Sequence, residues 1–242
     1  MPEKYKIIAS VGEDDIRNLQ KKDIRDIDVL EVRLDLFSRN YIQKEIKKKI
    51  KVLGVPALFT YRRAEDSSVK SYVKLFPEDV EGILQDFNDN NNYLDIELNR
   101  VDSIFTDYHL LNFRIIYSYH SFKKIISAKE MRDYIQNCRP VKKKNPIFKF
   151  AITPENIEET AEFMNDIKGL SKQNTMIGIC MGESGILSRV FGDYFKSSYT
   201  YMTLGEPKAP GQISIETFKK LRADLFKGAK YKEESEKEAI EE

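Results

Sequence analysis

The segment Ile147-Phe148-Lys149-Phe150-Ala151-Ile152 is a short apolar run with one lysine between two phenylalanines. It is bounded by Asn145-Pro146 and by Thr153-Pro154, and a bounded apolar run of this length is typical of a buried β-strand. A lysine on such a strand commonly extends its ammonium group to solvent. If the lysine is buried instead, desolvation lowers its pKa and favours the neutral amine, which is a nucleophile. The residue types in the rest of the chain favour this second arrangement.

Seven further apolar runs of similar length occur along the 242 residues. With the first, the runs are Lys6–Val11, Asp28–Leu36, Ala57–Arg62, Tyr93–Leu98, Arg114–His120, Ile147–Ile152, Met176–Met181 and Tyr199–Leu204. The segments between them carry apolar residues at helical spacing, and this alternation predicts a parallel sheet with helical crossovers. For a chain of this length the expected closed form is a (β/α)8 TIM barrel, here one catalytic domain over residues 1–226. An open, doubly wound sheet is the alternative, because periodicity does not separate the two.

Capping residues indicate where two of the helices begin. Ser127 and Glu130 have the spacing of a capping box. The segment Thr153-Pro154-Glu155 offers an N-cap, a proline for the first helical position and an acid for the helix dipole. The weakest helical pattern lies between residues 98 and 114, where it rests on Val101, Ile104 and Phe105. Residues 227–242 are highly charged and are expected to form a frayed helix or a disordered tail.

Charged residues alternate with apolar residues in several of the predicted strands. Glu31, Arg33 and Asp35 do so in one strand, and Asp95 and Glu97 in another. A strand covered by helices presents its apolar face outward, so these polar faces are expected to point into the barrel. Ionised groups inside a barrel must be paired, hydrogen-bonded or in contact with a ligand. A salt-bridge network that only fills the barrel is the alternative to a functional site. Several of the charges lie near the carboxyl ends of their strands, where barrel enzymes place their chemistry, and this favours a site.

The strand ends bring together Glu31, Arg33, Arg62, His120 and Lys149 at one end of the barrel. Neighbouring cations lower the pKa of a lysine further, because they disfavour its protonated form. His120 ends an apolar strand and is the natural acid–base group near neutral pH, whereas the other histidine of the chain is expected at the surface. A lysine, a histidine and arginines in one site indicate an enzyme that forms an imine with an anionic carbonyl compound.

The composition argues against several other classes of protein. The chain has 40 basic and 39 acidic residues, so nothing global attracts it to nucleic acid or to a membrane surface. The lysine runs at 47–49 and 142–144 are typical of solvated surfaces. No apolar run approaches the roughly 20 residues of a membrane span, and the N-terminus leaves no room for a signal peptide, so a cytoplasmic protein is expected. Cys138 and Cys180 have no metal-ligand spacing, and no metal is expected.

Further motifs occur in a fixed order along the chain. They are Glu31-x-Arg33-x-Asp35, Phe59-Thr60-Tyr61-Arg62, Asp95-x-Glu97-Leu98, Ser118-Tyr119-His120-Ser121-Phe122, Lys149 with its apolar neighbours, Met181-Gly182-x-x-Gly185 with Ser188-Arg189, and Ala209-Pro210-Gly211-Gln212. Each motif is weak alone. All of them in this order resemble type I 3-dehydroquinate dehydratase (3-dehydroquinase), from about Lys6 to Leu221.

This resemblance implies an enzyme that needs neither a metal nor a cofactor. It implies the dehydration of 3-dehydroquinate to 3-dehydroshikimate in the shikimate pathway of aromatic amino-acid biosynthesis. It implies that Lys149 forms a Schiff base with the ketone and that His120 acts as the general acid and base. It also implies a homodimer.

The same motifs imply which residues bind the substrate. Arg189 and Gln212 match residues that hold the substrate carboxylate. Glu31, Arg33 and Arg62 match residues that bind the ring hydroxyls. Further implied pocket residues are Ser10, the backbone at Val32, and Met181 as an apolar wall.

The chain departs from the family pattern at two positions. Where the family has a glutamate that orients the catalytic histidine, this chain has Asp66 with Glu65 beside it, and either carboxylate suits that role. The segment Gly205–Gln212 resembles the lid that closes over the substrate. Within it, Lys208 stands where the family often has a serine, and this lysine either pairs with the substrate carboxylate or faces solvent.

Two other functions fit part of the pattern. A class I aldolase-like barrel would use the same lysine, but an aldolase for sugar phosphates requires glycine-rich backbone amides after strands seven and eight. This chain has Ser188-Arg189 and Pro210-Gly211-Gln212 there, which suit a carboxylate better. A non-catalytic binding protein would be expected to have lost the lysine–histidine pair, and both residues are present.

Overall fold

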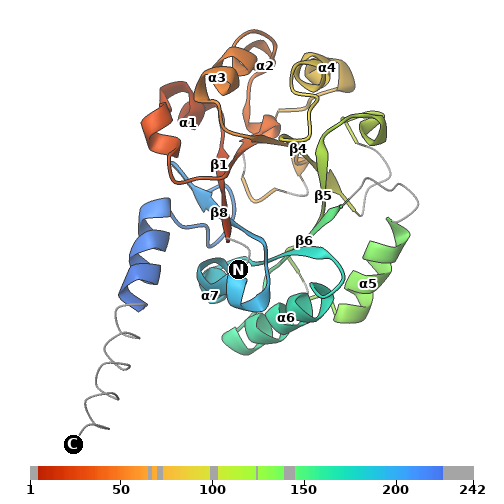
Figure 1. The fold of residues 1–242 in the computed structure, drawn as a ribbon, viewed down its shortest axis with the longest axis vertical. Helices are drawn as coiled ribbons and strands as arrows, with labels where there is room; N and C mark the ends of the chain where they lie inside the picture. Colours follow the sequence, from red (N-terminus) through yellow and green to blue (C-terminus); the bar gives the residue numbers. More distant parts are fainter. Residues whose placement is uncertain are drawn as a thin grey trace, which may run out of the picture.

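The computed structural model describes residues 5–64, 67–69, 73–98, 103–123, 125–138 and 145–225. Within these ranges eight parallel strands form one sheet in the order β7-β6-β5-β4-β3-β2-β1-β8. The strands are β1 Lys6–Val11, β2 Val29–Arg33, β3 Ala57–Thr60, β4 Tyr93–Glu97, β5 Arg114–Ser121, β6 Ile147–Ile152, β7 Thr175–Cys180 and β8 Tyr199–Thr203. A bridge between Met176 and Ser197 joins the two edges, so the sheet forms a nearly closed barrel (Figure 1). The TIM-barrel prediction is confirmed, and the open doubly wound sheet is wrong.

Helices surround the barrel on the outside (Figure 1). The α-helices are α1 Glu13–Asn18, α2 Arg39–Lys44, α3 Ile46–Leu53, α4 Pro77–Asp86, α5 Ala128–Asn137, α6 Ile157–Leu170 and α7 Ile186–Phe191, and another helix covers 215–225. The 3-10 turns are η1 Lys21–Ile24, η2 Leu34–Leu36, η4 Tyr108–Leu110, η6 Glu183–Gly185 and η7 Gly192–Phe195. Apolar side chains of the helices share one buried cluster with the outward side chains of the strands, as Phe163 of α6 does with Phe150 of β6. Removal of this apolar surface from water stabilises the barrel.

The interior of the barrel is divided into an apolar half and a polar half. Toward the amino ends of the strands, inward side chains such as Ile8, Leu58 and Ile116 form a second buried apolar cluster. Because side chains alternate along a strand, the next inward positions are two residues further on. At that level β1 to β6 contribute the buried polar residues Ser10, Glu31, Thr60, Asp95, Ser118 and Lys149, whereas β7 contributes isoleucine. The fold therefore places the charged groups toward the carboxyl ends of the strands, as the alternation predicted.

One of the two predicted helix starts is confirmed and the other is wrong. The Ser127 hydroxyl accepts a hydrogen bond from the Glu130 N–H at 3.2 Å, and the Glu130 carboxylate accepts from the Ser127 N–H at 2.8 Å. Helix α6 does not begin at Pro154. Its N-cap is Asn156, whose side chain accepts a hydrogen bond from the Glu159 N–H at 2.9 Å. An asparagine that satisfies a free backbone donor defines the start of this helix, although the Thr-Pro-Glu pattern lies two residues earlier.

Several strands end earlier than the apolar runs predicted. The segment Leu34–Leu36 is the turn η2, because Asp35 turns inward and accepts hydrogen bonds from the Arg33 guanidinium and from the Arg62 N–H. Between residues 103 and 113, where a weak helix was predicted, the chain contains only the turn η4 Tyr108–Leu110. Val101 lies outside the described residues, as does the predicted tail 227–242. No helix in the described part of the chain has the length and apolarity needed to cross a membrane.

Candidate active site

Lys149 points from β6 into the barrel and is 5% exposed. Its Nζ lies 3.7 Å from Oδ2 of Asp95 on β4 and 4.1 Å from the centroid of the Tyr201 ring on β8. Burial lowers the pKa of Lys149 below its ordinary value, the charge of Asp95 raises it, and the charge of Arg62 lowers it again. The lysine is therefore not a solvent-exposed strand residue. It is a buried amine whose neutral form is favoured relative to that of an ordinary lysine.

Arg62 links the two carboxylates of β4. Its NH2 lies 2.8 Å from Oδ2 of Asp95, and its NH1 donates to Oε2 of Glu97 at 2.8 Å. Burial alone would raise the pKa of Asp95, but the charges of Arg62 and Lys149 hold it well below its usual range. Ser118 adds a hydrogen bond to Asp95. Two cations and two carboxylates therefore lie close together, and this balance allows all of them to be buried.

His120 is held in one orientation by Glu97. Its Nδ1 lies 2.9 Å from Oε2 of Glu97, and its backbone N–H donates to Oε1 of the same carboxylate at 3.1 Å. Since the carboxylate also accepts from Arg62, it acts as an acceptor, and we infer that the proton of the neutral imidazole is on Nδ1. Burial lowers the pKa of His120 well below its ordinary value, and the charges of Arg62 and Lys149 lower it further. The imidazole is therefore neutral at pH 7, with the lone pair of Nε2 available as a base.

A second polar group is formed by side chains of β1, β2 and β3 and by Gln212, which follows β8. Glu31 accepts hydrogen bonds from Ser10 and from Thr60, the latter at 2.9 Å. Gln212 donates to the Ser10 hydroxyl at 3.0 Å and to the Met202 carbonyl at 2.8 Å. These residues present a carboxylate, a hydroxyl and an amide, which are groups suited to bind hydroxyls.

Arg33 belongs to the same region and is held by a bidentate pair. Its Nε and NH2 donate to the two carboxylate oxygens of Asp35 at 3.0 and 2.8 Å. NH2 also donates to the Ser67 hydroxyl at 3.0 Å, and NH1 donates to the Lys208 carbonyl at 3.3 Å. The guanidinium therefore connects β2 with the lid segment.

Arg189 is a buried cation whose hydrogen bonds in the described part of the chain go to carbonyl groups. Its NH1 donates to the Tyr201 carbonyl at 3.2 Å and its NH2 to the Pro210 carbonyl at 3.1 Å. Within the described ranges its Nε has no partner, and no carboxylate forms an ion pair with it. Burial without such a counter-ion lowers the pKa of Arg189 to about 10. A guanidinium in this state is an anion site, and its planar fork suits a carboxylate.

The segment 205–212 packs over the opening of the site. Gly211 has a φ of +70°, and a Cβ there would lie 2.2 Å from the Gly182 carbonyl oxygen, so only glycine allows this close approach. The Lys208 ammonium pairs with Asp15 Oδ2 at 2.9 Å and donates to the Glu206 carbonyl at 2.8 Å. The Lys208 N–H donates to the Gln212 side chain at 2.7 Å. In this structure the Lys208 side chain joins the lid to α1.

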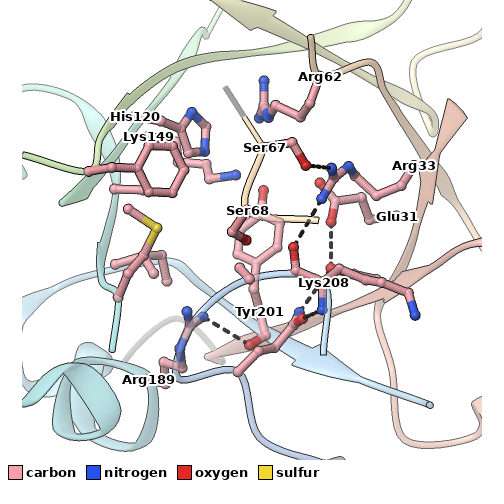
Figure 2. A pocket seen from close by; sticks show the side chains of 17 residues that line it. Glu31, Arg33, Arg62, Ser67, Ser68, His120, Lys149, Arg189, Tyr201 and Lys208 are labelled. Atoms are coloured by element: carbon pink, nitrogen blue, oxygen red, sulfur yellow. Dashed lines mark hydrogen bonds between the residues drawn. The ribbon is translucent and has the colours of Figure 1, made fainter. Parts of the chain in front are cut away.

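The structure brings most of the predicted site residues into one pocket (Figure 2). The predicted residues that line it are Ser10, Glu31, Arg33, Arg62, His120, Lys149, Met181, Arg189, Lys208 and Gln212. The Val32 side chain lies in the outer apolar cluster, and the role of its backbone stays a prediction. Asp66 and Glu65 lie outside the described residues, so their proposed contact with the histidine is not tested.

Sequence reasoning missed several functional residues. Glu97 binds the histidine, and Asp95 pairs with the lysine and Arg62, although neither had been given a role. The sequence did indicate that both side chains point inward, because Asp95 and Glu97 alternate with the apolar residues Leu94 and Ile96. Tyr201 also lines the pocket. The sequence did not indicate this, because a tyrosine in an apolar strand is usually a core residue. Among the described residues, no group of three or more histidine, cysteine or acidic side chains has an arrangement that could hold a metal ion.

Comparison with known proteins gives consistent matches over nearly the whole chain. The family model of type I 3-dehydroquinase matches residues 6–227. A 3-dehydroquinate dehydratase from Hydrogenobaculum sp. (strain Y04AAS1) is 31% identical over 209 residues, which cover 84% of this chain and 90% of that protein. One from Methanococcus maripaludis (strain C5) is 28% identical over 221 residues, which cover 88% of this chain and 96% of that protein.

Solved structures of enzymes with this name share the fold. The type I 3-dehydroquinate dehydratase from Clostridium difficile has a TM-score of 0.74 at 20% identity and covers 93% of this chain and 94% of its own. The 3-dehydroquinate dehydratase from Geobacillus kaustophilus HTA426 has a TM-score of 0.73 at 20% identity, with 93% and 92% covered.

Proposed function

Because the chain belongs to the type I 3-dehydroquinase family, and is therefore a hydro-lyase with 3-dehydroquinate dehydratase activity, we propose that Lys149 carries out this dehydration through a Schiff base. The observation that carries the proposal is the buried amine of Lys149, whose pKa is lowered, in one pocket with the neutral imidazole of His120. Figure 2 shows the two side chains on the same side of that pocket. A neutral amine is the form that attacks a ketone.

The reaction begins when Nζ of Lys149 attacks the ketone carbon of 3-dehydroquinate. A carbinolamine forms and loses water, which leaves an iminium ion. The positive nitrogen withdraws electrons from the neighbouring carbon, so His120 Nε2 removes a proton from that carbon and an enamine forms. The enamine electrons expel the hydroxyl group, which takes the proton from His120 and leaves as water. Hydrolysis of the imine by another water releases 3-dehydroshikimate and restores the amine.

The charges of the pocket orient the substrate for these steps. We assign the substrate carboxylate to Arg189, whose Nε has no partner among the described residues, together with Gln212 of the same pocket. The ring hydroxyls are assigned to Glu31, Arg33 and Arg62, with Ser10 next to Glu31. The role of Lys208 is assigned to lid closure, because its ammonium is paired with Asp15. A homodimer is a further proposal, which rests on the family resemblance alone, and a cytoplasmic location stays a prediction from the sequence.

Borohydride trapping tests the proposed covalent step. The protein is incubated with 3-dehydroquinate and sodium borohydride, which reduces an imine to a stable secondary amine. Peptide mapping by mass spectrometry is expected to find the adduct on Lys149 and on no other lysine. A sample with borohydride and no ligand is the control. An adduct on another residue, or no adduct under conditions of full turnover, would contradict the proposal.

The ion pair between Lys208 and Asp15 is expected to hold the lid closed. Asp15→Asn keeps an oxygen to accept from the Gly12 N–H, which donates to Asp15 at 2.7 Å, but removes the charge. The Michaelis constant is expected to rise roughly fivefold, since a partly buried ion pair of this kind contributes about 1 kcal/mol. Steady-state kinetics measure the change. Asp26→Asn is the matched control, because Asp26 pairs with Lys219 on the exposed surface. An equal rise in both variants would show that the lid contact has no specific effect.

A further inference from the structure

Tyr201 occupies the middle of the active site. It is the third residue of β8, its side chain points into the barrel, and it is 5% exposed. Nζ of Lys149 lies 4.1 Å from the centroid of its ring. Figure 2 shows this ring rising from β8 into the pocket, between Lys149 and Glu31. Its backbone carbonyl accepts from Arg189, so the residue lies between the proposed carboxylate site and the reactive amine.

The hydroxyl of Tyr201 has no hydrogen-bond partner among the described residues. A buried hydroxyl without a partner costs about 1–3 kcal/mol, so such groups are rare in native proteins. The two other tyrosines inside the barrel differ in this respect. The hydroxyls of Tyr93 and Tyr199 lie 3.3 Å apart, and Arg114 donates to Tyr93 at 2.6 Å. Of these three tyrosines, Tyr201 lines the pocket and is the one whose hydroxyl has no partner within the described residues.

We propose that Tyr201 is a substrate-binding residue, whose hydroxyl donates a hydrogen bond to the substrate's ring hydroxyl on the carbon next to the ketone. The inference rests on the position that the proposed function gives to the ketone, within bonding distance of Lys149 Nζ. Because Nζ lies 4.1 Å from the ring centroid, a ketone bonded to Nζ lies beside this ring, and the proposal places the hydroxyl of the next carbon at the phenol oxygen.

The chemistry of the neighbours fits a donor at this point. The carboxylate of Glu31 lines the same pocket and accepts hydrogen bonds, so a substrate hydroxyl that reaches both groups donates to Glu31 and accepts from Tyr201. Burial raises the pKa of Tyr201 well above its ordinary value, and the charges of Glu31 and Asp95 raise it further. The phenol is therefore protonated at neutral pH and can act as a donor.

Tyr201→Phe tests the inference, because it keeps the ring over Lys149 and removes only the hydroxyl. Calorimetric titration with 3-dehydroquinate in the Lys149→Ala background measures binding without the covalent step. The dissociation constant is expected to rise about tenfold on the additional change Tyr201→Phe. The melting temperature of the ligand-free protein is expected to stay the same or to rise, since an unbonded buried hydroxyl is removed.

Tyr199→Phe is the matched control on the same strand. Its hydroxyl lies within hydrogen-bond distance of Tyr93, so its removal is expected to lower the melting temperature and to leave the dissociation constant unchanged. A second ligand, the analogue of 3-dehydroquinate that lacks the hydroxyl next to the ketone, identifies the bonded group. With this analogue, Tyr201→Phe is expected to cause no further loss of affinity.

Three results would each overturn the inference. They are an unchanged dissociation constant in Tyr201→Phe, an equal loss with the deoxy analogue, and a lower melting temperature of the ligand-free protein. The Schiff base is tested separately by borohydride trapping on the otherwise unchanged chain. A failure of the covalent mechanism and a failure of the Tyr201 contact are therefore distinguishable.

Discussion

Replacing Lys149 with alanine is expected to abolish turnover while the barrel stays folded. Without the amine no iminium ion forms, so no positive nitrogen withdraws electrons when the proton is removed from the carbon next to the ketone. We expect kcat to fall by at least about four orders of magnitude, or about 5 kcal/mol of activation free energy. Asp95 keeps its ion pair with Arg62 in this variant, so no buried carboxylate is left without a partner. Steady-state assays of product formation measure the loss, and circular dichroism measures the fold.

Lys6→Ala is the matched control for this experiment. Lys6 is also a strand lysine with its Nζ over a tyrosine ring, 5.4 Å from the centroid of Tyr199, but it lies at the amino end of β1. Lys6 shares a face of β1 with Ser10 but lies four residues earlier, at the opposite end of the strand from the pocket, so Lys6→Ala is expected to have the same kcat as the unchanged chain. A full dehydration rate in Lys149→Ala would rule out the Schiff base. An equal loss in Lys6→Ala would show that the effect comes from the fold.

Replacing His120 with asparagine is expected to reduce kcat by about 10²–10⁴-fold, the range typical of a lost general acid–base. Binding of 3-dehydroquinate is expected to persist, because Arg189, Glu31 and Arg33 are unchanged.

Replacing Glu97 with glutamine is expected to lower kcat by the same order, because it disturbs the position of His120. Glutamine leaves one oxygen for the donors that Glu97 accepts from, which include Arg62 NH1, the His120 N–H and His120 Nδ1, so its NH2 group faces a donor and the imidazole loses its fixed orientation. Retention of more than half the rate in either variant would contradict the assigned roles.

The pH dependence of stability reports on the same imidazole. The pKa of His120 is lower in the folded protein than its ordinary value, so the unfolded state binds more protons below about pH 6.5. The stability of the folded protein is therefore unaffected by His120 above that pH, and it decreases as the pH falls below it, because the unfolded state takes up a proton on this residue. Urea denaturation between pH 5 and pH 7 measures this slope, and His120→Asn is expected to reduce it. An unchanged slope in that variant would show that the histidine is not buried in its neutral form.

The inward direction of Glu31, Arg33 and Asp95 followed from the alternation of their strands, since a period of two residues assigns each side chain to one face. The end of β2 did not follow from the sequence. Asp35 leaves the strand because its carboxylate bonds Arg33 and the backbone of Arg62, and the second of these partners is distant in the chain. A local sequence pattern does not predict a contact between residues that are distant in the chain.

The sequence by itself determined the alternation of strands and helices, the polar interior, and the lysine and histidine that meet there. These features depend on periodicity and residue type, which are local properties of a chain. Only the tertiary structure decided that Glu97 orients His120, that Lys208 pairs with Asp15, and that the hydroxyl of Tyr201 has no partner within the described residues. Such pairings depend on which strands are neighbours, on the stagger between them, and on the rotamers that buried side chains adopt. Those quantities are fixed only when the whole barrel closes.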